Sequence, residues 1–170
     1  MKNSVRLAAL CCALLISTGA LAVTAAALDA VGGAVLSTSA AKGVLHQCSR
    51  QTPQNVLGTW TPTKQDVREL EIRLPTALAL EAQKHGTSYM PEMTFQRQYA
   101  GFLVGKRRIV YVNGFPRSAG DPARDGTTAA RNFDWHREPV VVCDGGPAFF
   151  GVEYDPEKKT FAHFEFNGLL

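Results

Sequence analysis

Residues 139–167 constrain the fold of this chain more than any other stretch. They read PVVVCDGGPAFFGVEYDPEKKTFAHFEFN, in which two strong turn signals, DGGP and DPEKK, separate three runs rich in β-forming residues. In the second and third runs the side chains alternate with a period of two, so each strand has one apolar face and one mixed face. The stretch therefore predicts a three-stranded meander. The residues expected on its apolar face are Phe150, Val152, Tyr154, Ala162, Phe164 and Phe166.

The register of the last two strands follows from these faces. Opposing Tyr154 to Ala162 aligns the two apolar sides, and Glu153 then lies opposite His163 on the other side. Such a pair is either an exposed cross-strand contact or a carboxylate that orients the imidazole and raises its pKa.

The N-terminus has the layout of a secretory signal peptide over residues 1–27. Lys2 and Arg6 form a positively charged region, residues 7–16 (LAALCCALLI) are apolar, and two Ala-x-Ala sites follow. An uncleaved membrane anchor of about 20 residues is the alternative, which the Ser, Thr and Gly residues after position 16 weaken. We therefore expect a periplasmic or secreted protein that leaves the membrane after cleavage.

Export leaves Cys48 and Cys143 as the cysteine pair of the mature chain, because Cys11 and Cys12 lie in the signal. In an oxidising compartment this pair predicts a disulfide, with two buried thiols as the alternative. A disulfide that closes so long a loop stabilises by about 4–5 kcal/mol in the chain-entropy model.

Composition and charge are those of one globular domain. Hydrophobic residues make up 45% of the chain and charged residues 19%. Removal of Lys2 and Arg6 takes the basic count from 18 to 16 against 15 acids, a balance that argues against a nucleic-acid partner. Residues 28–45, rich in Ala, Gly and Ser without a period, are expected to be a disordered lead-in to a single domain at 46–170.

The one long helix is predicted between Thr61 and Gly86. Thr61 suits the N-cap, Pro62 suits the first helical position, and Gly86 suits the C-terminal cap. Pro75 interrupts the middle of the apolar stripe. We therefore expect a kink just before it, or two abutting helices.

Residues 93–115 predict a β-hairpin. The sequence VGKR, from Val104 to Arg107, fits a two-residue type II′ turn, because Gly105 readily adopts the positive φ that the first central position needs.

The two faces of this hairpin differ in character. One face carries Gln98, Asn113 and Tyr111, so it mixes amides with aromatics, and pairing across the turn places Gln98 opposite Asn113. We interpret it as the open side of the sheet, with a binding surface as the alternative. The other face is the better core face, with Phe95, Tyr99, Leu103, Val110 and Val112.

Residues 116–137 show no hydrophobic period and predict a long loop. Loops of this length inside compact domains are usually functional or mobile. The last residues of the loop, NFDWH, place two aromatics among polar groups and form the best candidate recognition element. The alternative is a flexible insertion whose aromatics pin it to the core. The candidate binding residues are Arg131, Asp134, Trp135, His136 and Arg137, together with Tyr111 on the mixed hairpin face.

These elements predict an α+β fold in which one long, Pro-kinked helix packs on an antiparallel sheet of about five strands, with one disulfide. This order resembles the cystatin-like and nuclear-transport-factor-like α+β folds. The strings RQYAGFLVGKRRIVYVNGF and CDGGPAFFGVEYD resemble those of uncharacterised bacterial exported proteins. The resemblance transfers no catalytic residue, and a shared fold does not by itself imply a function.

Catalytic and metal-binding motifs are weak. The sequence has no Gly-x-Ser-x-Gly elbow, and its four histidines show no spacing typical of metal ligands, so we expect neither a metal nor another cofactor.

Two functional hypotheses follow. The first is a small exported binding or inhibitor-type module that recognises another envelope or extracellular protein through the loop and the sheet face. The second is a small enzyme with a cavity between helix and sheet, in which Asp134 and His136, or Glu153 and His163, act as acid and base. A pocket lined by a buried carboxylate and an imidazole would favour the enzyme, and a filled core would favour the binding module.

Overall fold

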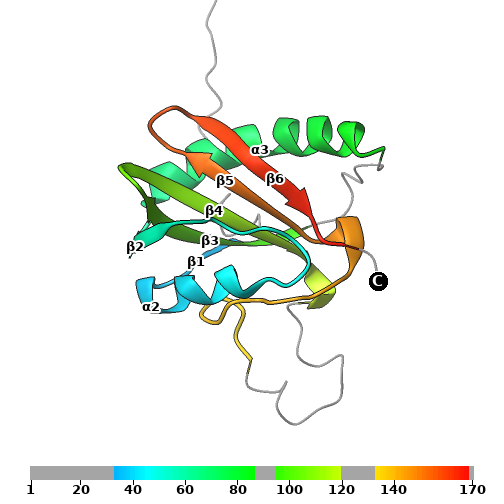
Figure 1. Cartoon of the computed structure of the whole chain (residues 1–170), viewed down its shortest axis with the longest axis horizontal. Helices are drawn as coiled ribbons and strands as arrows, with labels where there is room; N and C mark the ends of the chain where they lie inside the picture. Colours follow the sequence, from blue (N-terminus) through cyan, green and yellow to red (C-terminus); the bar gives the residue numbers. More distant parts are fainter. Residues whose placement is uncertain (1–32, 87–94, 120–132, 169–170) are drawn as a thin grey trace, which may run out of the picture.

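The computed structural model describes residues 33–86, 95–119 and 133–168. Within these residues the chain forms one six-stranded sheet, one long helix and a few short helical segments (Figure 1). The strands are β1 (Gly33–Val35), β2 (Val56–Trp60), β3 (Phe95–Val104), β4 (Arg107–Pro116), β5 (Phe150–Asp155) and β6 (Thr160–Phe166). The helical segments are α2 (Thr38–Ala41), η1 (Lys42–His46), α3 (Lys64–Lys84), η2 (Arg117–Ala119) and η5 (Gly146–Ala148). The α+β class was expected. The sheet has six strands rather than about five, and it is mixed rather than wholly antiparallel, because β1 pairs in parallel with β3.

The strands lie in the order β1-β3-β4-β5-β6, and β2 pairs with β3 as well. β4 pairs with β3 along the whole of one edge of β3. The other edge of β3 pairs with two strands, β1 and β2. Residues 97–99 pair in parallel with β1, and residues 101–104 pair antiparallel with β2. The chain therefore leaves this edge after β1, crosses one face of the sheet and returns to the same edge as β2.

Each face of the sheet is covered by a different part of the chain (Figure 1). On one face, α3 buries an aliphatic stripe against the strands. On the other, α2 and η1 pack over β3 and β4. The first core contains Val67, Leu70, Leu74, Leu78, Phe95, Tyr99, Val110, Val112, Phe150, Val152 and Tyr154. The second contains Leu36, Ala41, Val44, Ala100, Phe102, Ile109 and Tyr111.

Two expectations about the second face are wrong. Residues 28–45 were expected to be disordered, but residues 33–45 contain β1, α2 and η1 and completely bury Leu36, Ala41 and Val44. The mixed hairpin face was interpreted as open, but this segment covers it. On the other face, the missing side chain of Gly33 leaves room for Tyr99 of the first core: a Cβ added there would lie 2.6 Å from the Tyr99 ring. A short amphipathic segment needs few apolar residues, so it leaves no clear period in the sequence.

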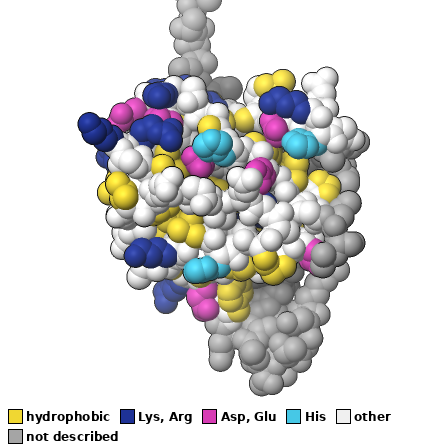
Figure 2. All heavy atoms as spheres, in the orientation of Figure 1, with side chains coloured by type: hydrophobic (Ala, Val, Ile, Leu, Met, Phe, Trp, Pro, Cys, Tyr) yellow, Lys and Arg dark blue, Asp and Glu magenta, His cyan; other side chains and the backbone are white. Residues whose placement is uncertain are grey.

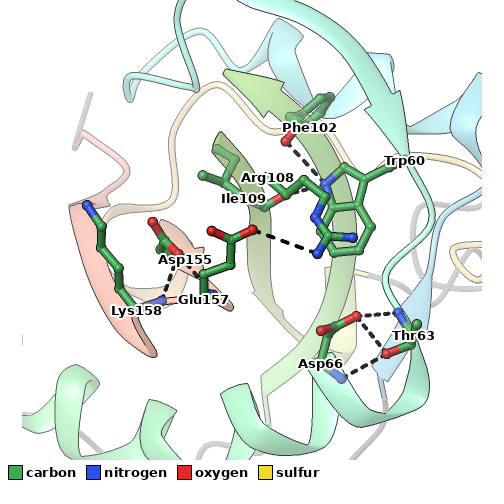
Figure 3. Close-up of polar contacts among 9 residues, drawn as sticks. All are labelled: Trp60, Thr63, Asp66, Phe102, Arg108, Ile109, Asp155, Glu157 and Lys158. Carbon is green, nitrogen blue, oxygen red and sulfur yellow. Dashed lines mark hydrogen bonds and ion pairs between the residues drawn. The ribbon is translucent and has the colours of Figure 1, made fainter. Parts of the chain in front are cut away.

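The helix α3 begins two residues later than expected. Thr63, not Thr61, is the N-cap, and it forms a capping box with Asp66, in which each side chain accepts from the other residue's backbone N–H (Figure 3). Asp66 serves in place of the more usual Glu at this position. The helix then runs without a break through Pro75, so the two abutting helices do not form. Gly86 follows the helix with φ +63°, the left-handed conformation that ends many helices.

The β3–β4 hairpin confirms the predicted register. Val104 pairs with Arg107 and Gln98 pairs with Asn113. Gly105 has φ +59° and is the one turn residue with positive φ, as a type II′ turn requires.

Trp60 attaches β2 to this hairpin (Figure 3). Its Nε1 donates to the carbonyl oxygens of Phe102 (3.2 Å) and Ile109 (3.1 Å). The Arg108 guanidinium lies 5.2 Å from the centroid of the indole and 3.8 Å from the Glu157 carboxylate. Arg108 thus contacts both an aromatic ring and a carboxylate.

The β5–β6 hairpin departs from simple alternation through a β-bulge. Phe150 pairs with Phe166 in the expected register, but past Gly151 the register shifts by one, and Ala162 lies opposite Glu153. His163 has φ +50°, which is uncommon for a residue other than glycine. The aromatic pattern explains the shift: Phe161, Phe164 and Phe166 all pack against the α3-side core. Strict alternation would place Phe161 on the opposite face.

The disulfide between Cys48 and Cys143 is present, with the two Cα atoms 4.8 Å apart. It joins the segment before β2 to the segment before η5, as predicted. Within the described residues, no helix is both long and apolar enough to cross a membrane.

Candidate functional site

Residues 139–143 were expected to form a strand, but side-chain amides hold their backbone instead. The N–H of Val140 donates to Gln98 Oε1 (2.9 Å). Its carbonyl oxygen accepts from Asn113 Nδ2 (2.9 Å) and Gln47 Nε2 (2.9 Å). These amides satisfy the backbone groups that a neighbouring strand would otherwise pair. The segment therefore lies against the sheet without joining it.

The same pattern continues toward the end of the chain. The carbonyl oxygen of Val142 accepts from Asn167 Nδ2 (2.9 Å). Arg50, which is 7% exposed, connects the cluster: its guanidinium donates to Tyr111 Oη (3.1 Å) and to the side-chain oxygens of Asn113 and Asn167. The amides of the mixed hairpin face, Gln98 and Asn113, are thus used in hydrogen bonds to the backbone of this same chain.

Gln98 also fixes the end of the long loop. Its Nε2 donates to the carbonyl oxygens of Trp135 (2.5 Å) and Glu138 (2.6 Å). The Trp135 ring makes an edge contact with the buried Phe115 at a centroid distance of 5.8 Å and stacks on His136 at 3.8 Å. Trp135 therefore pins the loop to the sheet, which is the structural role considered as the alternative for the loop aromatics.

Asp134, His136 and Arg137 form an exposed polar tip on this support. Asp134 Oδ1 lies 2.9 Å from His136 Nδ1, and Asp134 Oδ2 lies 3.5 Å from Arg137 Nε. The exposed fractions of the side chains are 44% for Asp134, 61% for His136 and 86% for Arg137. Hydrogen bonds from the backbone N–H and side chain of His136 lower the pKa of Asp134, so the carboxylate is charged at neutral pH.

The remaining predicted site residues lie elsewhere. Arg131 is outside the described residues. Tyr111 is buried beneath residues 36–50, where it accepts a hydrogen bond from Arg50, so it does not belong to the exposed tip. Burial raises the pKa of the Tyr111 hydroxyl, which stays protonated at neutral pH.

A pocket of about 290 Å³ lies on the same sheet face, beyond the segment that covers β3 and β4. Glu153, whose side chain is 8% exposed, contributes to its lining, and His163 Nδ1 lies 3.1 Å from Glu153 Oε1. The predicted proximity of these two residues is therefore confirmed, although the bulge places Ala162 opposite Glu153 in the strand pairing. Figure 2 shows acidic and histidine side chains together near the middle of this face. The lining residues are Gln51, Thr52, Gln54, Asn55, Val104, Arg107, Tyr111, Glu153 and His163.

Side chains of the first core fill the middle of the helix–sheet interface, and a pocket of about 330 Å³ lies at its edge between α3 and β6. The lining residues of this pocket are Ala77, Leu80, Glu81, Lys84, Phe161, Ala162, His163 and Phe164. The interface also holds one carboxylate that sequence reasoning missed. Glu71 of α3 accepts from Tyr99 Oη (2.7 Å) and lies 3.4 Å from Arg97 Nε. Burial raises the pKa of Glu71, and the contacts with Arg97 and Tyr99 partly offset this rise. These partners make Glu71 a satisfied buried group.

The residues that organise the loop end were visible in the sequence but were not assigned a role. Gln98 and Asn113 were placed correctly opposite each other, and amides on a strand face are a usable signal for a buried polar network. Arg50, Gln47 and Asn167 gave no such signal, because their contacts join positions far apart in the chain.

Comparisons of the chain with protein-family models, curated proteins and solved structures found no match. Among the residues that the structure describes, no group of three or more His, Cys, Asp or Glu side chains is arranged to hold a metal ion.

Proposed function

We propose that this protein is an exported binding module that recognises another envelope or extracellular protein through the end of its long loop. The observation that carries the proposal is the fixation of Trp135 and Glu138 by Gln98, which is completely buried. It holds the tip formed by Asp134, His136 and Arg137 in one position while leaving it exposed. A pre-organised tip loses little conformational entropy on binding, and this favours affinity.

Export is part of the same proposal. It is supported by the apolar N-terminal stretch with its Ala-x-Ala sites, by the resemblance to bacterial exported proteins, and by the disulfide. Expression of the full chain in an exporting host should yield protein that begins at residue 23 or 28. Mass spectrometry of the purified product reads this directly, and a chain that keeps residues 1–22 would contradict the signal peptide.

The binding test uses the exposed tip and a matched surface control. Arg137→Ala and His136→Ala remove tip side chains, whereas Lys106→Ala removes a charge at the exposed β3–β4 turn. Immobilised wild-type protein and the three variants are exposed to an envelope extract, and captured proteins are quantified by mass spectrometry. We expect a partner retained by wild type and Lys106→Ala and depleted by either tip variant. Equal capture by all four proteins would refute the role of the tip.

Trp135→Ala is a less specific probe than the sequence suggested. Because Trp135 packs against Phe115, its removal is expected both to lose the partner and to loosen the loop end. Arg137→Ala leaves that packing intact, so a loss of binding there reports on the exposed surface alone.

A second candidate function is acid–base catalysis by Glu153 and His163, which is favoured by their position in the pocket. A panel of chromogenic esters, glycosides and phosphate esters tests it, with His163→Asn as the variant and Lys106→Ala as the control. Turnover that His163→Asn abolishes and Lys106→Ala preserves would support catalysis. Equal rates in all three proteins, or no turnover, would contradict it for these substrates.

A further inference from the structure

The pocket beside β5 and β6 contains a buried carboxylate whose hydrogen-bonding capacity is largely unused. Glu153 as a residue is 6% exposed, and within the described chain His163 is the one side chain at ion-pair distance from its carboxylate. An ionised carboxylate can accept about four hydrogen bonds, and a buried charge is costly unless it is paired. The imidazole has 69% of its side chain exposed, so solvent screens its interaction with the carboxylate and makes it a weak partner.

The backbone around His163 is bent in a way that serves this pocket. Between the pairs Gly151–Glu165 and Glu153–Ala162, the bulge sets His163 and Phe164 against the single residue Val152, and His163 adopts φ +50°. Bulges often re-aim a side chain next to a functional site, and left-handed residues other than glycine cluster at such sites. The core accounts for the packing of Phe161, but it does not require a histidine at the bulged position.

A positive charge lines the same pocket. Arg107 follows the β3–β4 turn and is exposed, and no carboxylate of the described residues lies within ion-pair distance of its guanidinium. The neighbouring Arg108 does not line the pocket and is engaged by Trp60 and Glu157. Gln51, Gln54 and Asn55 add neutral amides to the lining of the same pocket, and these can donate and accept hydrogen bonds.

We propose that this pocket binds a small zwitterion of the free amino-acid type, a role beyond protein recognition by the loop tip. The ligand ammonium donates to the Glu153 carboxylate, and the ligand carboxylate accepts from Arg107. Opposite charges in one pocket select a molecule that carries both, because a simple amine or acid leaves one protein charge without its partner. A pocket of about 290 Å³ is at the small end of ligand sites, which suits a ligand of this size.

The first experiment screens the full chain, purified after export with its disulfide intact. The ¹⁵N-labelled protein is titrated with each of the twenty common L-amino acids up to millimolar concentration. We expect saturable shifts of the backbone amides of Glu153 and His163 with at least one of them. The absence of saturable shifts at these two amides for every amino acid overturns the proposal.

The second experiment separates the two charge contacts. For the amino acid that binds, the analogue without the carboxylate and the analogue without the amine are titrated as well. We expect each analogue to bind about 10- to 100-fold more weakly, the effect of losing one charged hydrogen-bonding contact. Equal affinity for the amino acid and either analogue overturns recognition of a zwitterion.

Variants assign the contacts to residues. Glu153→Gln should weaken the amino acid about 10- to 100-fold and leave the analogue without the amine unaffected. Arg107→Gln should show the converse, losing affinity for the amino acid but not for the analogue without the carboxylate. Arg108→Gln is the matched control and should change neither affinity. Thermal melts verify that each variant is folded. Equal losses of amino-acid affinity in Glu153→Gln, Arg107→Gln and Arg108→Gln would refute the assignment.

Partner recognition by the loop tip and amino-acid binding in the pocket can be refuted independently of each other. Arg137→Ala lies outside this pocket and should leave amino-acid affinity unchanged, while Glu153→Gln should leave partner capture by the loop tip unchanged.

Discussion

Replacement of Gln98 by Leu is the sharpest test of how this fold holds its loop. Gln98 is completely buried and makes four hydrogen bonds: it donates to the carbonyl oxygens of Trp135 and Glu138, and it accepts from Val140 N and Asn113 Nδ2. Leucine has a similar size but cannot make any of them. At a net value of about 1 kcal/mol per hydrogen bond, the free energy of unfolding should fall by about 4 kcal/mol. That is a large part of the 5–15 kcal/mol typical of a domain.

The same strand offers a matched control. Gln96 lies two residues earlier, and its buried Oε1 has no hydrogen-bond partner in the described part of the protein. Gln96→Leu makes the same chemical change on the same face, but it removes an unsatisfied acceptor. We therefore expect its effect on the free energy of unfolding to be within about 1 kcal/mol of zero, or stabilising.

Urea denaturation of the two variants measures the difference. The midpoint should fall strongly for Gln98→Leu and little for Gln96→Leu, with the slope unchanged in both. Hydrogen exchange adds a local readout, because the Val140 amide loses its acceptor in Gln98→Leu and should exchange faster than in wild type. Equal midpoints for the two variants, or an unchanged exchange rate at Val140, would refute the role of Gln98 as a substitute strand partner.

Three further predictions concern other parts of the fold. Intact mass spectrometry should show Cys48 and Cys143 joined, and reduction should lower the free energy of unfolding by about 4–5 kcal/mol because the bond closes a loop of 95 residues; two alkylatable thiols in freshly exported protein would exclude the bond. Gly105→Val should lower the melting temperature more than Lys106→Val, because φ +59° at Gly105 strains a β-branched residue; equal melting temperatures would contradict the type II′ turn. Glu71→Gln should change the pH dependence of stability, because burial raises the pKa of Glu71 above 4.5. The wild type should therefore lose stability relative to the variant as the pH rises from below 4.5 through the raised pKa. Parallel profiles of unfolding free energy against pH, measured by urea denaturation, would contradict this.

Local patterns in the sequence were sufficient for the β3–β4 hairpin and the helix, whereas they did not predict the bulge in the β5–β6 hairpin. The VGKR turn and the alternation around it predicted the β3–β4 register residue by residue, because side-chain period and turn geometry together allow one pairing. The stripe from Val67 to Leu78 predicted α3, and an error of two residues in its N-cap arose because both Thr61 and Thr63 are competent caps.

Other elements depend on contacts between distant residues. β1 is three residues long and exists because β3 offers it a free edge, so it has no local signal. The run PVVVC has strong β-propensity but does not form a strand, because Gln47, Gln98 and Asn113 occupy its hydrogen-bonding groups. The candidate site shows the same division: Glu153 and His163 were placed together from the pattern, whereas the pocket around them needed residues 51–55.

What the sequence by itself determined is the α+β class, the disulfide, the long helix and the two hairpins, since each rests on period, turn chemistry or cysteine count. Only the tertiary structure decided that both faces of the sheet are covered, that the amides of β3 and β4 bind the chain's own backbone, and that a polar pocket opens beside β5 and β6. The physical reason is the range of the interactions. Backbone preferences and side-chain periodicity act between neighbours in the chain, whereas burial and hydrogen-bond satisfaction depend on groups such as Arg50 and Asn167, which meet only when the chain has folded.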